Sequence, residues 1–161
     1  MNKIVGPIGN PTHMYAGEIM SLTESQRTFL ENNNAAAMIT IAEDGMPKAV
    51  RVSIALIDGK LWSSGTQDRI RTDRLRRDPR CTLFVFDKQY SFLTLETAVT
   101  ILDGPDAPEL NLRLMRQMQN KPTGPISWFG QELDTDAFLQ TMVAHKRLVY
   151  QFEISHAYGV A

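Results

Sequence analysis

The sequence is poor in the residues that build disulfide-linked proteins and metal sites. It contains one cysteine, Cys81, and three histidines that lie far apart, His13, His145 and His156. A single cysteine excludes a disulfide or a thiolate metal cage within one chain, and no histidine has a second ligand at metal-binding spacing. We therefore expect no metal site. A reducing compartment, the cytoplasm, is the natural setting for such a chain.

Long apolar runs and an excess of one charge are also lacking. No stretch is apolar enough to span a bilayer or to resemble a secretory signal, so we expect no membrane partner. The 17 Lys and Arg residues are balanced by 18 Asp and Glu residues. Because a general nucleic-acid-binding domain is usually basic throughout, we expect no nucleic-acid partner. There is no Gly-x-Ser-x-Gly elbow and no Walker loop, and we assign no catalytic residue.

The remaining composition is that of an ordinary globular domain. The chain has 161 residues, of which 43% are apolar and 22% are charged, enough to enclose one core. Residues 1–20 contain Gly-Pro and Asn-Pro pairs and no sustained period, which predicts an irregular N-terminal arm. Residues 21–161 are predicted to form one domain.

Six segments have the composition of β-strands. The pairs Asp44-Gly45 and Asp58-Gly59 are typical of tight hairpin turns, so the first three strands should form a meander. The βαβ rhythm of parallel sheets is missing, which favours an antiparallel barrel. The predicted strands are 35–42, 48–57, 60–64, 81–86, 92–102 and 147–155.

Helical signals fall between and before these strands. The segment from Ser21 to Glu24 matches a capping box that would begin the first helix. A short helix should follow the third strand and end at Asp78-Pro79. Apolar periodicity predicts helices over residues 109–119 and 134–146, with a loop over residues 120–130 between them.

The chemistry of the sequence is concentrated in residues 63–79, at the end of a predicted strand. Thr66 or Asp68 could cap the helix that follows, whose free amides and dipole favour an anion at its N-terminus. Arg69 and Arg71 fall in the first turn, where a cation is unfavourable unless a bound anion offsets the repulsion. We therefore interpret this segment as a phosphate site. Additional hydroxyl donors would come from Ser63, Ser64 and Thr72.

The alternative interpretation is a solvated helix face. Six arginines lie between positions 69 and 80, interleaved with aspartates that could form surface ion pairs, and such pairs contribute about 0.2 to 1 kcal/mol each. We favour this alternative for Arg74, Arg76, Arg77 and Arg80. The aromatic residues are by default core residues, except for Tyr90, whose loop position would let it cross an interface and contact a planar ring.

Three stretches together resemble a known superfamily. They are Asp-Gly-x-Pro between two strands, Arg-x-Arg-Thr-x-x-Leu-Arg-Arg-Asp-Pro-Arg at positions 69–80, and Ile-Ser-His-x-Tyr-Gly at positions 154–159. The chain resembles the split β-barrel flavin and deazaflavin oxidoreductases, the superfamily of pyridoxamine 5'-phosphate oxidase. The likeness covers about residues 21–159. Within the superfamily it is closest to the actinobacterial branch that uses the deazaflavin coenzyme F420.

This resemblance implies a mainly β protein with helices, a six-stranded antiparallel split β-barrel that forms a homodimer with the cofactor at the subunit interface. The phosphate would be held by Arg69, Arg71 and Thr72, and Ser63 and Ser64 would approach the same side chain of the cofactor. The remaining implied contacts border the ring and its ribityl chain, namely Lys48, Val50, Arg51, Val52 and, from the other subunit, Tyr90.

The resemblance also implies an activity. Reduced F420 would transfer a hydride to an electron-poor double bond of a small organic substrate, with the hydride chemistry supplied by the cofactor. Two alternatives remain open: an FMN-binding flavoprotein on the same barrel, and a non-catalytic module that binds a cofactor, haem or another tetrapyrrole. The chain departs from its relatives at Arg51, where they often have a neutral residue, and at Glu96, where they commonly have glycine.

Overall fold

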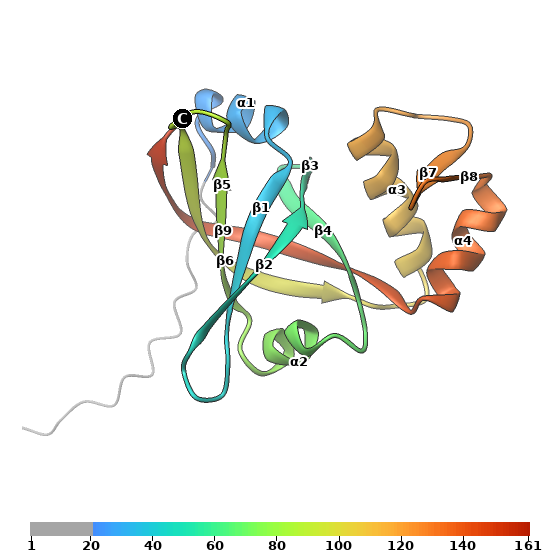
Figure 1. Ribbon diagram of the computed structural model, residues 1–161, viewed down its shortest axis with the longest axis horizontal. Helices are drawn as coiled ribbons and strands as arrows, with labels where there is room; N and C mark the ends of the chain where they lie inside the picture. Colours follow the sequence, from blue (N-terminus) through green and yellow to red (C-terminus); the bar gives the residue numbers. More distant parts are fainter. Residues whose placement is uncertain (1–20) are drawn as a thin grey trace, which may run out of the picture.

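The computed structural model describes residues 21–161, so the predicted arm and His13 lie outside the described residues. Within the described part, seven strands form one antiparallel sheet with the order β2-β1-β5-β6-β9-β4-β3 (Figure 1). The strands of this sheet are β1 (Ala35–Ile41), β2 (Pro47–Ser53), β3 (Ala55–Ile57), β4 (Lys60–Thr66), β5 (Arg80–Phe86), β6 (Phe92–Leu102) and β9 (Arg147–Val160).

The sheet curls because its two edge strands are consecutive in sequence. Only Ile54 separates β2 from β3, so the two edges must approach each other, and the sheet takes the shape of a half-barrel (Figure 1). The predicted antiparallel, mainly β fold is therefore confirmed. The predicted number of six strands is wrong: the segment expected as one strand over residues 48–57 breaks at Ile54, whose amide donates to the Asn34 carbonyl at 2.8 Å.

The long pairing of β6 with β9 contains a β-bulge. Glu96 pairs with His156 and Thr97 pairs with Ile154, which leaves Ser155 as the extra residue of β9. The Ser155 hydroxyl donates to the Glu96 carbonyl at 3.1 Å. A bulge bends its strand and increases the local twist, so Glu96 lies at a bend in the sheet.

Four helices surround the sheet in the described residues: α1 (Glu24–Asn32), α2 (Ile70–Arg77), α3 (Ala107–Gln119) and α4 (Thr135–Ala144). The predicted capping box is wrong by two residues, because Thr23 caps α1. The Thr23 hydroxyl accepts from the Gln26 amide at 3.2 Å, and the Gln26 side chain accepts from the Thr23 amide at 3.0 Å.

No helix in residues 21–161 is long and apolar enough to cross a membrane.

The segment predicted as a loop over residues 120–130 contains the first strand of a small hairpin, which ends at Leu133. Strands β7 (Ile126–Trp128) and β8 (Gln131–Leu133) form a separate two-stranded sheet. Three residues per strand are too few for a periodic pattern in the sequence. The hairpin lies with α3 and α4 in a lobe beside the barrel (Figure 1).

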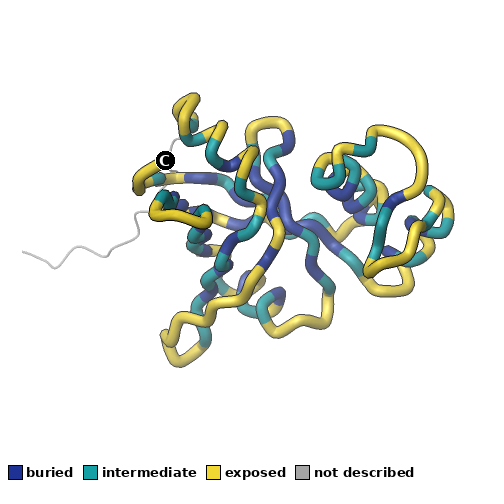
Figure 2. Tube along the Cα trace, turned by 45° about the horizontal axis from the view of Figure 1, so that its top comes forward, coloured by how far each residue is buried: buried dark blue, intermediate teal, exposed yellow. Residues whose placement is uncertain are grey.

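The apolar residues form two clusters on opposite faces of β4 and β9. Leu148, Tyr150 and Phe152 point into the half-barrel with Leu61, and we call this cluster the barrel core. Val149 points the other way and packs with the α3, α4 and β7 residues, and we call this cluster the outer core. Figure 2 shows the buried stretches gathered where the strands cross and the exposed stretches at the turns. The outer core supports the strand ends that carry the site described next.

Candidate functional site

The turn from β4 into α2 leaves the start of that helix without a side-chain cap. The N-cap residue is Arg69, which makes no capping hydrogen bond, so the predicted caps Thr66 and Asp68 are wrong. The Asp68 carboxylate instead lies 3.9 Å from the Lys146 ammonium. The Thr72 amide donates to the Arg69 carbonyl at 2.9 Å. The amides before it are those that a helix start leaves without an intrahelical acceptor, and the helix dipole places partial positive charge there. This end of α2 therefore suits an anion.

Two buried hydroxyl groups fix α2 to the sheet. The Thr72 hydroxyl donates to the Thr66 carbonyl at 2.7 Å, so its only proton is used and the Tyr150 hydroxyl must be the donor in their contact of 2.5 Å. Gly65 makes room for this arrangement, because a Cβ there would lie 2.4 Å from the Tyr150 ring. Thr72 is fully buried. Its hydroxyl therefore positions the helix and is not an exposed donor.

Arg71 lies against the same tyrosine. Its guanidinium is centred 5.9 Å from the Tyr150 ring centroid, and its Nε is buried with no hydrogen-bond partner in the described part of the chain. Arg147, the first residue of β9, is held in a similar way, with its guanidinium 4.8 Å from the Trp128 ring centroid and its Nε also buried without a partner.

The positive charges of these residues act on each other. Burial lowers the pKa of Arg147 below its usual value, and the charges of Arg69 and Arg71 lower it further. Within residues 21–161, no carboxylate forms an ion pair with any of the three. We call Arg69, Arg71 and Arg147 the arginine cluster. The sequence analysis missed Arg147; the only available signal was a basic residue directly before the last strand.

Three of the remaining arginines in and after α2 have protein partners, as the surface interpretation predicts. Their donors are taken up by a carboxylate or a backbone carbonyl, which leaves them less able to hold a ligand. The pairs are Arg76 with Asp103 at 3.0 Å, Arg77 with the Ile41 carbonyl at 2.6 Å, and Arg80 with Asp78 at 2.7 Å. Arg74 forms no ion pair within the described residues.

Ser63 and Ser64 lie in the middle of β4, which continues to Thr66, and they face opposite sides of the sheet. Ser63 pairs with Tyr150 in the register and is buried on the barrel side. The Ser64 hydroxyl donates to the Asn111 side chain at 2.6 Å on the side of α3. The structure therefore does not bring the two hydroxyls together, because side chains alternate along a strand. Asn111 is a fully buried polar residue in an otherwise apolar helix stripe.

The residues predicted on β2 lie in a separate region. Val50 and Arg51 help to line a hollow of about 260 Å³ together with Ala35–Ala37, Ala49 and Phe86. Val52 points into the barrel core, whereas Lys48 is exposed. Tyr90, in the turn between β5 and β6, is 96% exposed. No residue of the arginine cluster lines this hollow.

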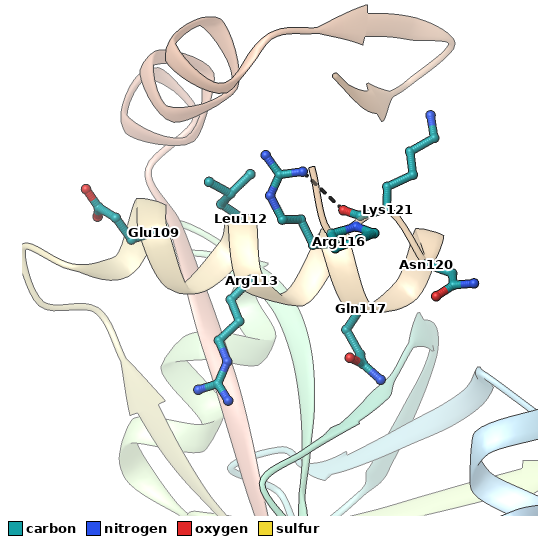
Figure 3. Close-up of a pocket in the computed structure, with 8 residues that line it drawn as sticks. Glu109, Leu112, Arg113, Arg116, Gln117, Asn120 and Lys121 are labelled. Carbon is teal, nitrogen blue, oxygen red and sulfur yellow. Dashed lines mark hydrogen bonds between the residues drawn. The ribbon is translucent and has the colours of Figure 1, made fainter. Parts of the chain in front are cut away.

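A third region is a hollow on the outside of α3. Its arginine and lysine side chains already have hydrogen-bond or ion-pair partners in the protein. This hollow measures about 420 Å³, and Figure 3 shows Arg116 bonded to the Lys121 carbonyl. Arg113 pairs with Asp58 at 2.6 Å, and Lys121 pairs with Glu132 at 3.3 Å. Among residues 21–161 no group of three or more His, Cys, Asp or Glu side chains could hold a metal ion. The arginine cluster is thus the stronger candidate for ligand binding.

Comparison with known proteins gives the family. A family model described as "Pyridoxamine 5'-phosphate oxidase" matches residues 22–160. The chain belongs to this family. This pyridoxamine 5'-phosphate oxidase family member also matches solved structures. Their sequence identity to it is low, so these matches show the fold alone.

Three solved structures illustrate the range of these matches. The conserved hypothetical protein Rv2991 from Mycobacterium tuberculosis has a TM-score of 0.68 and 20% identity, covering 88% of this chain and 86% of its own. A protein titled F420 Reductase has a TM-score of 0.63 and 18% identity, covering 85% of this chain and 98% of its own. The haem storage protein HutZ from Vibrio cholerae has a TM-score of 0.62 and 12% identity, covering 88% of this chain and 96% of its own.

The arginine cluster of this pyridoxamine 5'-phosphate oxidase family member fits a cofactor that carries a phosphate. The buried Nε atoms of Arg71 and Arg147 lack acceptors in the described chain, and a buried donor without an acceptor is unfavourable. Guanidinium groups bind phosphate with strong, charge-assisted hydrogen bonds. The donor set therefore matches the chemistry of an anionic cofactor.

Proposed function

We propose that this protein is an F420-dependent oxidoreductase, a reductase that acts in the cytoplasm. The observation that carries the proposal is the arginine cluster at the start of α2, where two guanidinium groups have buried donors without acceptors. The fold match to the protein titled F420 Reductase supports it. The single buried thiol, Cys81, agrees with a reducing compartment.

In this proposal Arg69 and Arg71 hold the cofactor phosphate together with the first amides of α2. Thr72 contributes by fixing the helix, since its hydroxyl is already bonded to Thr66 and Tyr150. Val50 and Arg51 border the ring at the hollow beside β2. The other contacts proposed from the sequence are Lys48, Val52, Ser63 and Ser64; Lys48 is exposed and Val52 lies in the barrel core.

We further propose a homodimer with one cofactor at each of two interface sites. The support is an apolar surface that one chain leaves exposed. Phe86, Phe92 and Val160 are neighbours in the register of three adjacent strands, and Phe86 is 53% exposed and Val160 66% exposed. A contiguous exposed apolar surface usually marks an interface. Tyr90, on the turn next to this surface, would reach the ring bound by the partner.

When bound, the reduced deazaflavin would supply a hydride for an electron-poor double bond of a small organic substrate. The chain itself would bind the cofactor, orient it and exclude water. The apolar lining of the hollow at β2, made by Ala35–Ala37, Ala49 and Val50, suits a planar ring better than a charged group.

The test is titration of the purified protein with F420 and with FMN, followed by fluorescence quenching. We expect F420 to bind more tightly. Tight FMN binding without F420 binding would replace the proposal by an FMN flavoprotein. Binding of haem alone would favour a non-catalytic module, the class suggested by the fold match to HutZ.

A pair of variants tests the assigned phosphate contact. Arg71→Ala should weaken F420 binding by about 1.5 to 3 kcal/mol, the usual scale for a hydrogen bond to a charged group. Arg76→Ala, on the same helix, is the matched control, because Arg76 already pairs with Asp103. Equal affinities for the two variants would remove Arg71 from the site.

A further inference from the structure

Arg147 is brought to the turn between β4 and α2 by strand pairing. It pairs with Thr66, the last residue of β4, and the Gln67 amide donates to the Lys146 carbonyl at 3.0 Å. These backbone contacts fix the start of β9 beside the residues that lead into α2. A distant part of the sequence therefore adds a cation to the site of Arg69 and Arg71.

The outer core fixes the Arg147 side chain. Its guanidinium stacks on Trp128, and the Trp128 ring meets the fully buried Phe138 edge-on, with the ring centroids 5.7 Å apart. A contact with an aromatic ring takes up none of the strong hydrogen bonds that a guanidinium can donate. Arg147 is therefore oriented without its hydrogen-bonding capacity being used by the described chain.

Arg113 also lies against a tryptophan ring, but unlike Arg147 it pairs with a carboxylate. Arg113 lies 5.5 Å from the Trp62 ring centroid, and it also pairs with the Asp58 carboxylate at 2.6 Å. Near the arginine cluster the carboxylate of Asp68 lies by Lys146 instead, at 3.9 Å. Arg147 thus has an aromatic support and no counter-charge of its own among residues 21–161.

Charge balance then constrains the ligand. One singly charged phosphodiester would neutralise only one of three neighbouring guanidinium groups. Arg71 lies on the Tyr150 side of β9 and Arg147 on the Trp128 side, so the two approach from opposite faces at the end of the sheet. A ligand that engages both must present acceptors in two directions.

We propose that Arg147 is a third anion-binding residue and that the site takes a ligand with at least two anionic groups, a phosphate and a second acidic group. Arg69 and Arg71 bind the first group and Arg147 binds the second. This inference rests on the anion site of the proposed function, and it adds the charge class of the ligand and a residue on a different element.

Calorimetric titration of the full chain with inorganic phosphate and with pyrophosphate tests the inference without any cofactor. We expect the wild-type protein to bind pyrophosphate about tenfold or more tightly than phosphate, since one additional charge-assisted contact is of that order. Arg147→Met keeps an unbranched chain against Trp128 and should remove this preference. Arg113→Met is the matched control and should retain it.

Two further measurements separate binding from structure. Arg147→Lys keeps the charge and should retain part of the preference that Arg147→Met loses, whereas a purely structural role would make the two variants alike. An unchanged preference in Arg147→Met, or no preference in the wild type, would overturn the inference. A retained pyrophosphate preference in a protein that binds neither F420 nor FMN would refute the proposed function alone.

Discussion

The hydrogen bond between Thr72 and Tyr150 offers a sharp test of how α2 is held. Both side chains are fully buried. Tyr150→Phe removes one donor, but the Thr72 hydroxyl keeps its bond to the Thr66 carbonyl. No buried donor is left without a partner, so the cost should be that of one ordinary hydrogen bond, about 1 kcal/mol.

Thr72→Val has nearly the same shape but a larger expected cost. It removes the bond to Thr66 and also leaves the Tyr150 hydroxyl buried without a partner, which together should cost about 2 to 3 kcal/mol. The double variant has no orphaned hydroxyl. It should therefore be more stable than Thr72→Val alone by about 1 kcal/mol, because removing both partners avoids the desolvation penalty.

The assay is equilibrium urea unfolding at one fixed protein concentration, since dimerisation would add a concentration-dependent contribution. Tyr158→Phe is the control, because Tyr158 is half-exposed and its hydroxyl makes no hydrogen bond within the described residues. If the double variant is less stable than Thr72→Val, or if the two single changes simply add, the Tyr150 hydroxyl does not depend on Thr72.

Other predictions concern the residues around this bond and at the end of α2. Gly65→Ala would place a Cβ 2.4 Å from the buried Tyr150 ring and should lower the free energy of unfolding by about 1 to 3 kcal/mol, measured by urea unfolding. Burial raises the pKa of Cys81 to about 12, so a thiol reagent at pH 8 should label the unfolded protein and not the folded one. The hydrogen bond from Arg80 lowers the pKa of Asp78, so Asp78→Asn should be destabilising above pH of about 4, the unfolded value, and the difference should vanish as the pH falls through the lower folded value.

Much of the sheet was predictable because its signals are local. The pair Asp58-Gly59 adopts positive φ angles of 50° and 77°, as the hairpin turn requires. The alternation of side chains along β9 accounts for Leu148 and Phe152 in the barrel core. It could not show that Val149 is buried as well, because the outer core that covers it is built from helices distant in sequence. The break at Ile54 likewise depends on closure of the sheet and not on the local pattern.

Only the part of the candidate site that is local in the sequence could be predicted. Arg69 and Arg71 lie in one short segment, so their shared position at the start of a helix could be inferred. Arg147 joins them only through the pairing of β4 with β9. Ser63 and Ser64 are adjacent in β4, so their hydroxyls face opposite sides of the sheet. Their shared approach to the cofactor stays a prediction.

The division among the arginines follows from the kind of partner that each one meets. Arg76 and Arg80 lie next to carboxylates, which neutralise their charge and occupy their donors. Arg71 and Arg147 lie near aromatic rings, which stabilise a cation without neutralising its charge. A stacked arginine without a carboxylate is therefore oriented before any ligand arrives, and less ordering entropy is lost on binding. The positions of Tyr150 and Trp128, more than the number of arginines, determine where this chain can hold an anion.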